Sequence, residues 1–509
     1  MGTRAGIRPL MSYQYLLGGE NRNSETMEIS EIFHLPMATL MALVGAFIVA
    51  LTFEAINGFH DAANAVATVI YTNSLRPKIA VVLSGIFNFL GVYIGGMGVA
   101  FAIVHLLPTD LLVNVGSRAS GAMIFAILIS AILWNFATWY KGIPASSSHT
   151  LIGAIVGVGL ANALVQGEPV FQAVHFRNIE AVVLSLLISP VMGFVLAAVL
   201  LALIRKSVRD RRLFESPEGR KPPAWVRAVL VLTSSGVSLA HGSNDGQKGV
   251  GLIMIILIAS LPAHFSLNPT YRSSNGKDAI KSLKQVEVVI QSKRGVMVSQ
   301  LDRRETETDN GSGLFSSKPL APVSLEIESI IETLQKQESV GSLTANERSQ
   351  LRKKIVLLED HIRKLKRSGA LNLSSSEKAT MDKARSELRK MTDYAPTWVI
   401  LAVAAAIGLG TMIGWKRVVV TVGEKIGKNP LTYAQGASSQ TVAMLTIGLA
   451  AVMGLPVSTT HVLSSGVTGT MVANKVGLKY GTLKEMAAAW IFTLPVTITL
   501  AGLLFLIFR

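Results

Sequence analysis

The sequence predicts an all-α polytopic membrane protein, with about ten transmembrane helices in two inverted repeats and broken helices at the membrane midplane. Three observations predict this fold class. Half of the 509 residues are hydrophobic, only 16% are charged, and the mean hydropathy is +0.45. Apolar stretches of membrane-spanning length recur along the chain. Two short polar clusters lie inside these stretches, and each cluster occurs twice.

The apolar stretches are about 20 residues long, which is the length of a helix that crosses the hydrocarbon core of a bilayer. They lie at residues 39–57, 79–105, 119–140, 148–166, 180–204, 226–240, 247–262, 395–414, 434–453, 459–474 and 487–508. The stretches 226–240 and 247–262 are short and flank a polar cluster, so we interpret them as one broken helix. About ten spans follow from this interpretation.

The distribution of basic residues predicts the orientation of the spans. The loop from Arg205 to Arg227 has the densest basic run between two spans, and short basic loops are usually cytoplasmic. Counting spans from this loop places the other short basic loops on the same side. Both termini and residues 263–393 are then predicted on the external face of the cell (inner) membrane.

These observations divide the chain into consecutive segments. We predict an N-terminal extension (1–38), a first transmembrane repeat (39–205), a basic cytoplasmic loop (206–225), the start of a second repeat (226–262), a hydrophilic insert (263–393) and the rest of the second repeat (394–509).

Composition limits the compartment and the partners. The chain has no cysteine, which excludes disulfides and thiolate metal sites. The first 35 residues lack the basic and apolar regions of a cleavable signal peptide. The net charge of +16 lies mostly beside helix ends, so topology explains it and we expect no nucleic-acid partner. The expected partners are the lipid bilayer and, as an assembly to consider, a second copy in a homodimer.

The predicted insert differs in kind from the rest of the chain. It carries about half of the charged residues and has no apolar run of spanning length. The spacing of Leu and Ile in residues 355–366 predicts a soluble amphipathic helix, and the remainder resembles a linker. We interpret the segment as an accessory insert without a role in the chemistry.

The doubled polar clusters predict the repeat. Residues 57–64 pair with 241–248, and residues 142–149 pair with 454–461. The first pair lies in the first and sixth predicted spans, and an odd offset inverts the second copy relative to the first. Inverted repeats hold substrate at their interface near the midplane, where helices are often interrupted. The predicted interruptions are Gly58, Gly242, Gly246, Gly249, Pro144 and Pro456.

The first cluster places polar groups on one stripe of a helix. Glu54, Asn57, Asp61 and Asn64 follow the i, i+3, i+7, i+10 spacing, and Ser238, His241, Asp245 and Lys248 repeat it. Interhelical hydrogen bonds explain one such Asn or Ser. They do not explain several charges, because each one costs about 3 kcal/mol at the centre of a membrane helix. We therefore interpret the two aspartates as functional.

The second cluster predicts a helix start. A Gly-x-Pro turn precedes Ser146, Ser147 and Ser148 in one copy and Ser458, Thr459 and Thr460 in the other, and a long apolar stretch follows. Ser and Thr cap helices well, and the free N–H groups and the dipole of a helix start attract anions. Simple capping explains either copy alone. Two matched copies, each followed by a histidine (His149 or His461), favour contact with an anion.

Together the clusters predict a site for an anion that is accompanied by cations. A bare anion would be repelled by Asp61 and Asp245, so these aspartates are predicted to hold protons, sodium or a divalent metal. Lys248 and the two sets of hydroxyls are predicted to hold the anion. The copies are unequal, since Asn64 corresponds to Lys248 and Asn57 to His241, so the anion is expected nearer the second repeat.

These motifs resemble those of the Pit family of inorganic phosphate transporters, and of its bacterial low-affinity type in particular. The resemblance rests on residues 54–68, 144–150, 241–249 and 454–461, and it covers about residues 40–262 and 395–508. It implies secondary active import of inorganic phosphate, as a neutral magnesium, calcium or zinc phosphate moved with protons. It also implies phosphate contacts from Asn64, Lys248 and the hydroxyls of Ser146, Ser147, Ser148, Ser458, Thr459 and Thr460.

The resemblance bears on coupling as well. Sodium-coupled animal members have a glutamate in each repeat where this sequence aligns Asn88 and Gln440. The missing carboxylates favour proton coupling, and a sodium-coupled phosphate symporter is the alternative. No resident cofactor is expected. The residues predicted to couple cations or protons are Asp61, Asp245, Glu54, Asn57, His60, His149, His241, Asn244, His461, Asn88 and Gln440, of which Asp61 and Asp245 would hold a co-transported metal.

Other classes fit the sequence less well. An intramembrane hydrolase has Ser, His and Asp, but an enzyme rarely needs two copies of its nucleophile. A passive anion channel would not concentrate its substrate, and a sulfate permease is the nearest rival among transporters. We therefore predict that the protein is not an enzyme.

Overall fold

A computed structural model describes residues 35–107, 117–167, 176–215, 217, 219–269, 271, 273–305, 320–336, 340–368 and 371–509. The described residues are almost entirely helical, and their only β-pairing is an isolated bridge between Gly427 and Leu478. The chain forms two compact units. We call them the membrane unit (residues 36–108, 117–256 and 396–509) and the insert unit (which includes residues 257–395).

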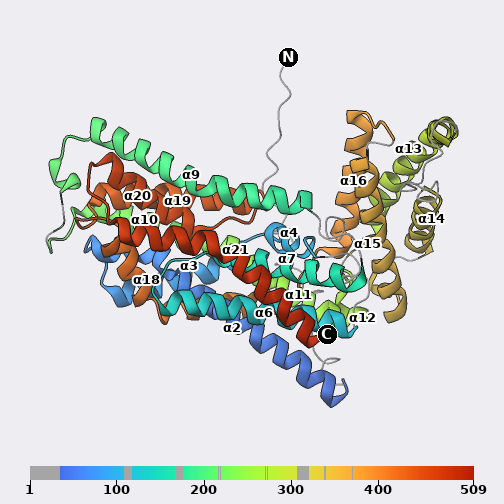
Figure 1. Cartoon of the computed structure of the whole chain (residues 1–509), viewed down its shortest axis with the longest axis horizontal. Coiled ribbons are helices and arrows are strands. Elements are labelled where there is room, and N and C mark those ends of the chain that lie inside the picture. Colours follow the sequence, from blue (N-terminus) through green and yellow to red (C-terminus); the bar gives the residue numbers. More distant parts are fainter. Residues whose placement is uncertain are drawn as a thin grey trace. The chain divides into compact units, whose positions relative to one another are not determined.

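The membrane unit contains the polar clusters. Its first part contains α2 (Met37–Tyr71), α3 (Pro77–Ile94), α4 (Gly98–Val104), α6 (Arg118–Tyr140), α7 (Ser147–Gln166), α9 (Phe176–Ser207) and η2 (Arg211–Phe214). Its later part contains α10 (Ala224–His241), the π-helical turn η3 (Gly242–Gly246), the start of α11 (Gln247–Ser260), α17 (Thr397–Met412), α18 (Lys416–Val420), the π-helical turn η5 (Thr421–Lys425), α19 (Tyr433–Val452), α20 (Thr459–Ala473) and α21 (Tyr480–Phe508). Figure 1 shows these elements in sequence colours.

Six described helices are long and apolar enough to cross a membrane by themselves: α2, α3, α6, α7, the part Val182–Ser207 of α9, and α21. The other predicted spans correspond to helices that are shorter or more polar, namely α10 with α11, α17, α19 and α20. The predicted span 79–105 is divided between α3 and α4. The all-helical class with several apolar spans is confirmed, and the count of about ten spans stays a prediction.

The packing within the membrane unit follows a paired pattern. Helix α2 packs on α17, and α3 packs on α10. In the same way α7 packs on α21 and α20 packs on α9, while α6 packs on α21 and α19 packs on α9. Two repeats would produce this pattern if α2, α3, α6, α7 and α9 corresponded to α10, α17, α19, α20 and α21. The pattern supports the predicted repeat, which stays a prediction.

Glycines permit close contacts between the backbones of neighbouring helices. A Cβ atom on Gly58 of α2 would lie 2.3 Å from the carbonyl oxygen of Ile407 on α17. A Cβ atom on Gly242 would lie 2.1 Å from the carbonyl oxygen of Asn88 on α3. Only glycine therefore lets these backbones touch without a shift. The packing distance, rather than a break in the helix, explains Gly58.

The prediction that Gly58 interrupts its helix is wrong, because α2 runs unbroken from Met37 to Tyr71. In the second copy the polar cluster does fall at an irregularity, since Gly242 and Gly246 are the first and last residues of the π-helical turn η3. The same prediction is wrong for Gly249, which lies within α11, where a Cβ atom would meet the carboxyl group of Glu54 at 2.5 Å. Pro144 and Pro456 lie in the turns that precede α7 and α20.

The insert unit has its own hydrophobic core. Its elements are α12 (Pro262–Phe265), α13 (Ser273–Glu305), α14 (Leu320–Lys336), η4 (Val340–Ser342), α15 (Ala345–Ser368) and α16 (Ser375–Thr392). Helix α15 contains the predicted amphipathic helix at 355–366. The expectation that the rest resembles a linker is wrong, because apolar residues of α13, α14, α15 and α16 pack together. Its core residues include Leu283, Val286, Ile327, Ile355 and Leu388.

Candidate functional site

Both predicted helix starts are present. Ser146 caps α7, and its Oγ accepts a hydrogen bond of 3.2 Å from the backbone N–H of His149. Ser458 caps α20 in the same way, with a bond of 3.2 Å from the N–H of His461. The first N–H groups of a helix have no intrahelical acceptor, so each start presents donors and the positive end of a helix dipole.

Asp61 of α2 and Asp245 of η3 meet at the start of α7. The hydroxyl oxygen of Ser147 lies 3.3 Å from Oδ2 of Asp61 and 3.1 Å from Oδ2 of Asp245. The two aspartates are only 2% and 0% exposed. A serine hydroxyl has one proton to donate, so at any moment it satisfies only one of the two carboxylates. Ser147 therefore bridges the pair without satisfying both.

Lys248 neutralises one of these charges. Its Nζ lies 2.8 Å from Oδ1 of Asp245, and it also donates to the hydroxyl of Ser148. Ser148 in turn donates to the carbonyl oxygen of Val457, in the turn before α20, at 2.7 Å. Lys248 is fully buried. Because a buried ammonium needs a partner of opposite charge, Lys248 and Asp245 stabilise each other.

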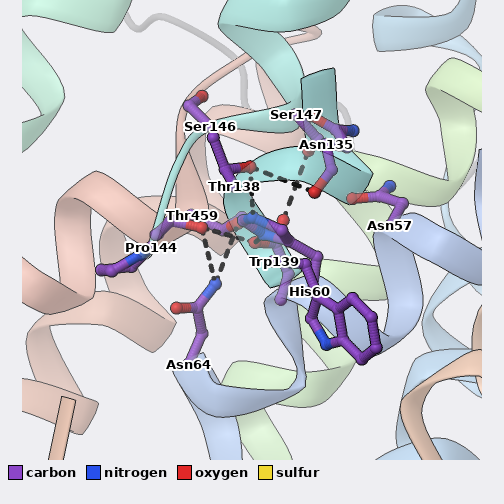
Figure 2. Close-up of polar contacts among 12 residues, drawn as sticks. Asn57, His60, Asn64, Asn135, Thr138, Trp139, Pro144, Ser146, Ser147 and Thr459 are labelled. Atoms are coloured by element: carbon purple, nitrogen blue, oxygen red, sulfur yellow. Dashed lines mark hydrogen bonds and ion pairs between the residues drawn. The ribbon is translucent and has the colours of Figure 1, made fainter. Parts of the chain in front are cut away.

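The first aspartate is held by the other helix start. Thr460 of α20 donates to Oδ1 of Asp61 at 2.5 Å. The amide of Asn64 donates to the hydroxyls of Thr460 at 3.1 Å and Thr459 at 3.4 Å. Figure 2 shows Asn64 directed at the start of α20 and Ser147 beside the other polar side chains of the cluster. Residues of α2 thus contact the start of α20, while Lys248 contacts the start of α7.

Two of the predicted histidines contact the carboxylates. Nδ1 of His60 lies 3.1 Å from Oδ1 of Asp61, and its Nε2 lies 3.2 Å from the hydroxyl of Thr138. Figure 2 shows His60 beside Thr138. Nε2 of His241 lies 3.6 Å from Oδ2 of Asp61 and 3.7 Å from Oδ2 of Asp245. The two imidazoles therefore border the carboxylate pair.

The second ring nitrogen of His241 fixes its role. Its Nδ1 lies 3.0 Å from Oδ1 of Asn88, whose own amide N–H donates to Thr411 at 2.8 Å. Nδ1 is therefore the donor, and in neutral His241 the lone pair of Nε2 faces the carboxylate oxygens. A proton or a metal ion between these groups removes that repulsion. Asp61, His241 and Asp245 each offer one ligand atom, and these atoms lie within 4.8 Å of one another.

Other predicted residues lie outside this cluster of bonds. The amide of Asn57 donates to Glu54 at 3.4 Å, one to two turns before Asp61, and both side chains are buried. Gln440 accepts from Thr233 at 3.0 Å and donates to the carbonyl of Ala65 at 2.8 Å. These three residues have no hydrogen bond to either aspartate among the bonds of the described residues.

The other two predicted histidines, His149 and His461, form a separate cluster of aromatic rings. The rings of His149 and His461 are 4.7 Å apart, and the ring of Trp490 lies 4.1 Å from that of His461. Nδ1 of His149 lies 2.8 Å from the hydroxyl of Ser146. The two rings thus link the start of α7 to that of α20.

Asn244 joins η3 to the turn before α20. Its amide donates to the carbonyl oxygen of Leu455 at 3.0 Å, and its Oδ1 accepts from the N–H of Val457 at 3.5 Å. It therefore binds the turn before α20 rather than the carboxylates.

Sequence analysis missed Thr138 and Thr411. Thr138 holds His60, and Thr411 holds Asn88 and through it His241. Each is a threonine among mostly apolar residues of its helix, and such hydroxyl side chains are common in membrane bundles. No local pattern distinguishes them, because their partners lie on other helices.

The fold and the site define a membrane transport protein. Its helices are apolar, and a cluster of buried charges lies between two helix starts. Residues 57–501 match the model of the phosphate transporter family, and the chain belongs to this family. The family and its relatives are transporters and not enzymes, as predicted.

The relatives cover nearly the whole chain. The chain is 44% identical to the low-affinity inorganic phosphate transporter PitA of Escherichia coli K12, over 92% of this chain and 96% of that protein. It is 43% identical to PitB of the same strain, over 91% of this chain and 95% of that protein. A solved structure of a sodium-dependent phosphate transporter is similar in fold, with a TM-score of 0.50 and 19% identity over 92% of this chain and 98% of that one.

Proposed function

We propose that this protein imports inorganic phosphate by secondary active transport, as a neutral divalent-metal phosphate in symport with protons. The observation that carries the proposal is the contact of both aspartates with Ser147, at the start of α7. A buried pair of carboxylates beside an anion-attracting helix start suits a substrate that contains both a cation and an anion.

The starts of α7 and α20 both offer hydrogen-bond donors to an anion. The hydroxyls of Ser147, Ser148 and Thr460 now donate to Asp61, Asp245 or a carbonyl group. Phosphate oxygens accept the same bonds, and the backbone N–H groups of the two helix starts add further donors. Lys248 supplies the positive charge that phosphate needs. On binding, these hydroxyls would therefore donate to phosphate oxygens instead of to the carboxylates and the carbonyl group of the protein.

The cation has its own ligands. Asp61, His241 and Asp245 supply two carboxylate oxygens and one imidazole nitrogen, a set that suits divalent metals, and the metal here is part of the substrate. The two aspartates and Lys248 together leave a net negative charge, so a cation must enter with the anion. Protonation of His60 or His241 offers an alternative neutralisation and a route for coupled protons.

Uptake by proteoliposomes tests the proposal. Labelled phosphate should accumulate when the external side is acidic, and magnesium should increase the rate. An imposed sodium gradient should have no effect; if only sodium drives uptake, the protein is a sodium symporter instead. Competition by arsenate but not sulfate would support phosphate as the anion.

Two variants test the site. Asp61→Asn should abolish pH-dependent uptake, because it removes one carboxylate of the cation site. Ser147→Ala should reduce uptake at least about tenfold, since one bond to a charged group contributes about 1.5–3 kcal/mol. Ser130→Ala is the matched control, because the hydroxyl of Ser130 is buried and, within the described part of the chain, bonds only to the carbonyl of Ile127 at 3.0 Å. Equal uptake by the two serine variants would contradict the assignment of Ser147.

The sidedness stays part of this proposal. We place the termini and residues 263–393 on the external face of the cell (inner) membrane, and the basic segment 206–225 in the cytoplasm. The variant Ser376→Cys tests this orientation, because the chain has no cysteine of its own. A thiol reagent that does not cross membranes should label the variant in sealed cells. Labelling only after the cells are opened would mean that the orientation is the reverse.

A further inference from the structure

A basic pocket lies in the membrane unit away from the carboxylate pair. It has a volume of about 640 Å³ and lies where the turn after α6 meets the segment from α17 to η5. Its charged lining residues are Lys141, Lys416, Arg417 and Lys425, and no acidic residue is among the described residues that line it. We call it the basic pocket. Four cations without a lining carboxylate attract an anion.

The walls of the pocket are held in place by their own contacts. The indole N–H of Trp139 donates to the carbonyl of Gly414 at 2.9 Å, which joins α6 to the end of α17. The guanidinium of Arg417 donates to the carbonyl of Tyr140 at 2.7 Å and lies 5.1 Å from the centre of the Trp139 ring. Arg417 is therefore part of the wall, and the pocket is formed before any ligand binds.

The lysines are available to a ligand. Lys141 and Lys416 are exposed, and within the described residues neither makes a hydrogen bond or ion pair. The nearest acidic neighbour in sequence is Glu424, which does not line the pocket and accepts a hydrogen bond of 2.7 Å from Tyr71. A ligand anion thus meets little competition from the protein's own carboxylates.

Exposed apolar side chains lead along two helices toward the pocket. On α6 they are Leu133, Phe136 and Tyr140, which are 51%, 48% and 62% exposed. Near the end of α17 they are Leu409, which is 60% exposed, and Ile413, which directly follows the helix and is 67% exposed. The spacings of three and four residues place Leu133, Phe136 and Tyr140 on one face of α6. Aromatic residues beside lysines and arginine are typical of the level of lipid headgroups.

We propose that the basic pocket binds the headgroup of an anionic phospholipid, with acyl chains along the exposed faces of α6 and α17. The phosphate of the headgroup would lie among Lys141, Lys416 and Arg417. Basic pockets between membrane helices bind such headgroups through this combination of charge and apolar surface. Free phosphate satisfies the lysines in the same way, but it leaves the two apolar faces unused.

The lipid would join two segments that lead to the transport site. Trp139 directly follows Thr138, which contacts His60. The hydroxyl of Thr421 donates to the carbonyl of Gly142 at 2.7 Å, in the turn that leads to Ser146. A headgroup between Lys141 and Lys416 restrains the same two segments. The bound lipid should therefore stabilise the folded chain.

Lipid titration of the full-length protein in detergent micelles tests the proposal. Dioleoyl phosphatidylglycerol should raise the melting temperature at a lower concentration than dioleoyl phosphatidylcholine. In the double variant Lys141→Gln/Lys416→Gln, the half-maximal concentration of phosphatidylglycerol should rise about tenfold or more, given the usual contribution of each lysine near an anionic surface. Arg417 is kept in this variant, so the wall contacts remain.

A second double variant separates the pocket from general surface charge. Lys206→Gln/Lys484→Gln removes two exposed lysines that do not line the pocket, and its response to phosphatidylglycerol should match that of the original chain. The proposal would be overturned if both double variants lost the response to phosphatidylglycerol equally. It would also be overturned if phosphatidylglycerol and phosphatidylcholine stabilised the original chain equally.

Soluble anions separate the lipid from free phosphate. Inorganic phosphate and glycerol 3-phosphate should stabilise the original chain and Lys141→Gln/Lys416→Gln to the same extent. If the pocket variant loses the response to these soluble anions, the pocket binds free phosphate and the assignment to a lipid is wrong.

Discussion

Lys248 is the buried cation on which the charge balance of the transport site depends. Its ammonium lies 2.8 Å from Asp245, and the two side chains are 0% and 1% exposed. Lys248→Met keeps most of the length of the side chain and removes the charge. The variant therefore tests whether the ion pair stabilises the fold, separately from the contact with phosphate that we propose for Lys248.

The structure sets the expected magnitude. Without Lys248, Asp245 keeps the hydroxyl of Ser147 at 3.1 Å, and Nε2 of His241 is 3.7 Å away. Neither replaces a full positive charge at short distance, and removal of one partner of a buried ion pair costs about 3–5 kcal/mol. Lys248→Met/Asp245→Asn removes both charges and should recover most of this loss. We expect a coupling energy of about 2–3 kcal/mol between the two positions.

Two assays separate stability from transport. The free energy of unfolding, measured in mixed micelles with a denaturing detergent, should fall for Lys248→Met and recover in the double variant. Phosphate uptake by proteoliposomes should be lost in both, because neither has the ammonium that we propose binds the anion. Lys206→Met, at an exposed position, is the control for the loss of a lysine. If the single variant is as stable as the original chain, or the double variant no more stable than the single one, Lys248 does not compensate a buried charge.

Two further predictions concern packing and capping. Gly58→Ala should lower the free energy of unfolding by about 1–3 kcal/mol, because its methyl group would meet the carbonyl of Ile407 at 2.3 Å, whereas Gly45→Ala in the same helix meets nothing within 4 Å and should be neutral or stabilising. Ser374→Ala should destabilise α16 by about 1 kcal/mol, since its hydroxyl accepts from the N–H of Glu377 at 3.2 Å in a capping box. Hydrogen exchange of α16 measures this loss, with Ser386→Ala at an exposed position of the same helix as the control, and equal protection in the two variants would contradict the capping role.

Local patterns were sufficient for the two helix starts of the candidate site. The predicted starts at Ser146 and Ser458 are N-caps in the structure, because capping depends on a hydroxyl and an N–H group three residues apart. The apolar stretch predicted at 459–474 corresponds to α20 at Thr459–Ala473. Hydropathy and capping are properties of neighbouring residues, so no knowledge of packing was needed.

The same reasoning failed where a residue's role depends on a distant neighbour. Gly58 was expected to break its helix, but it lies in an unbroken helix and admits the backbone of α17. The partners of Gln440, which are Thr233 and the carbonyl of Ala65, were not predictable for the same reason, and its coupling role stays a prediction. The insert was partly interpreted as a linker because its apolar residues are spaced among many charges. Its core forms only when four helices pack.

By itself, the sequence determined the class of this protein, the approximate positions of most of its apolar helices and most of the polar residues of the candidate site. Only the tertiary structure decided which of these residues meet: Ser147 contacts both aspartates, Lys248 reaches Ser148, and Asn64 reaches Thr460. The physical reason is that periodicity shows which face of a helix is polar but not which helix lies opposite. Which helices lie opposite each other depends on how closely their backbones can approach. In this protein, glycines at the helix crossings allow the close approaches.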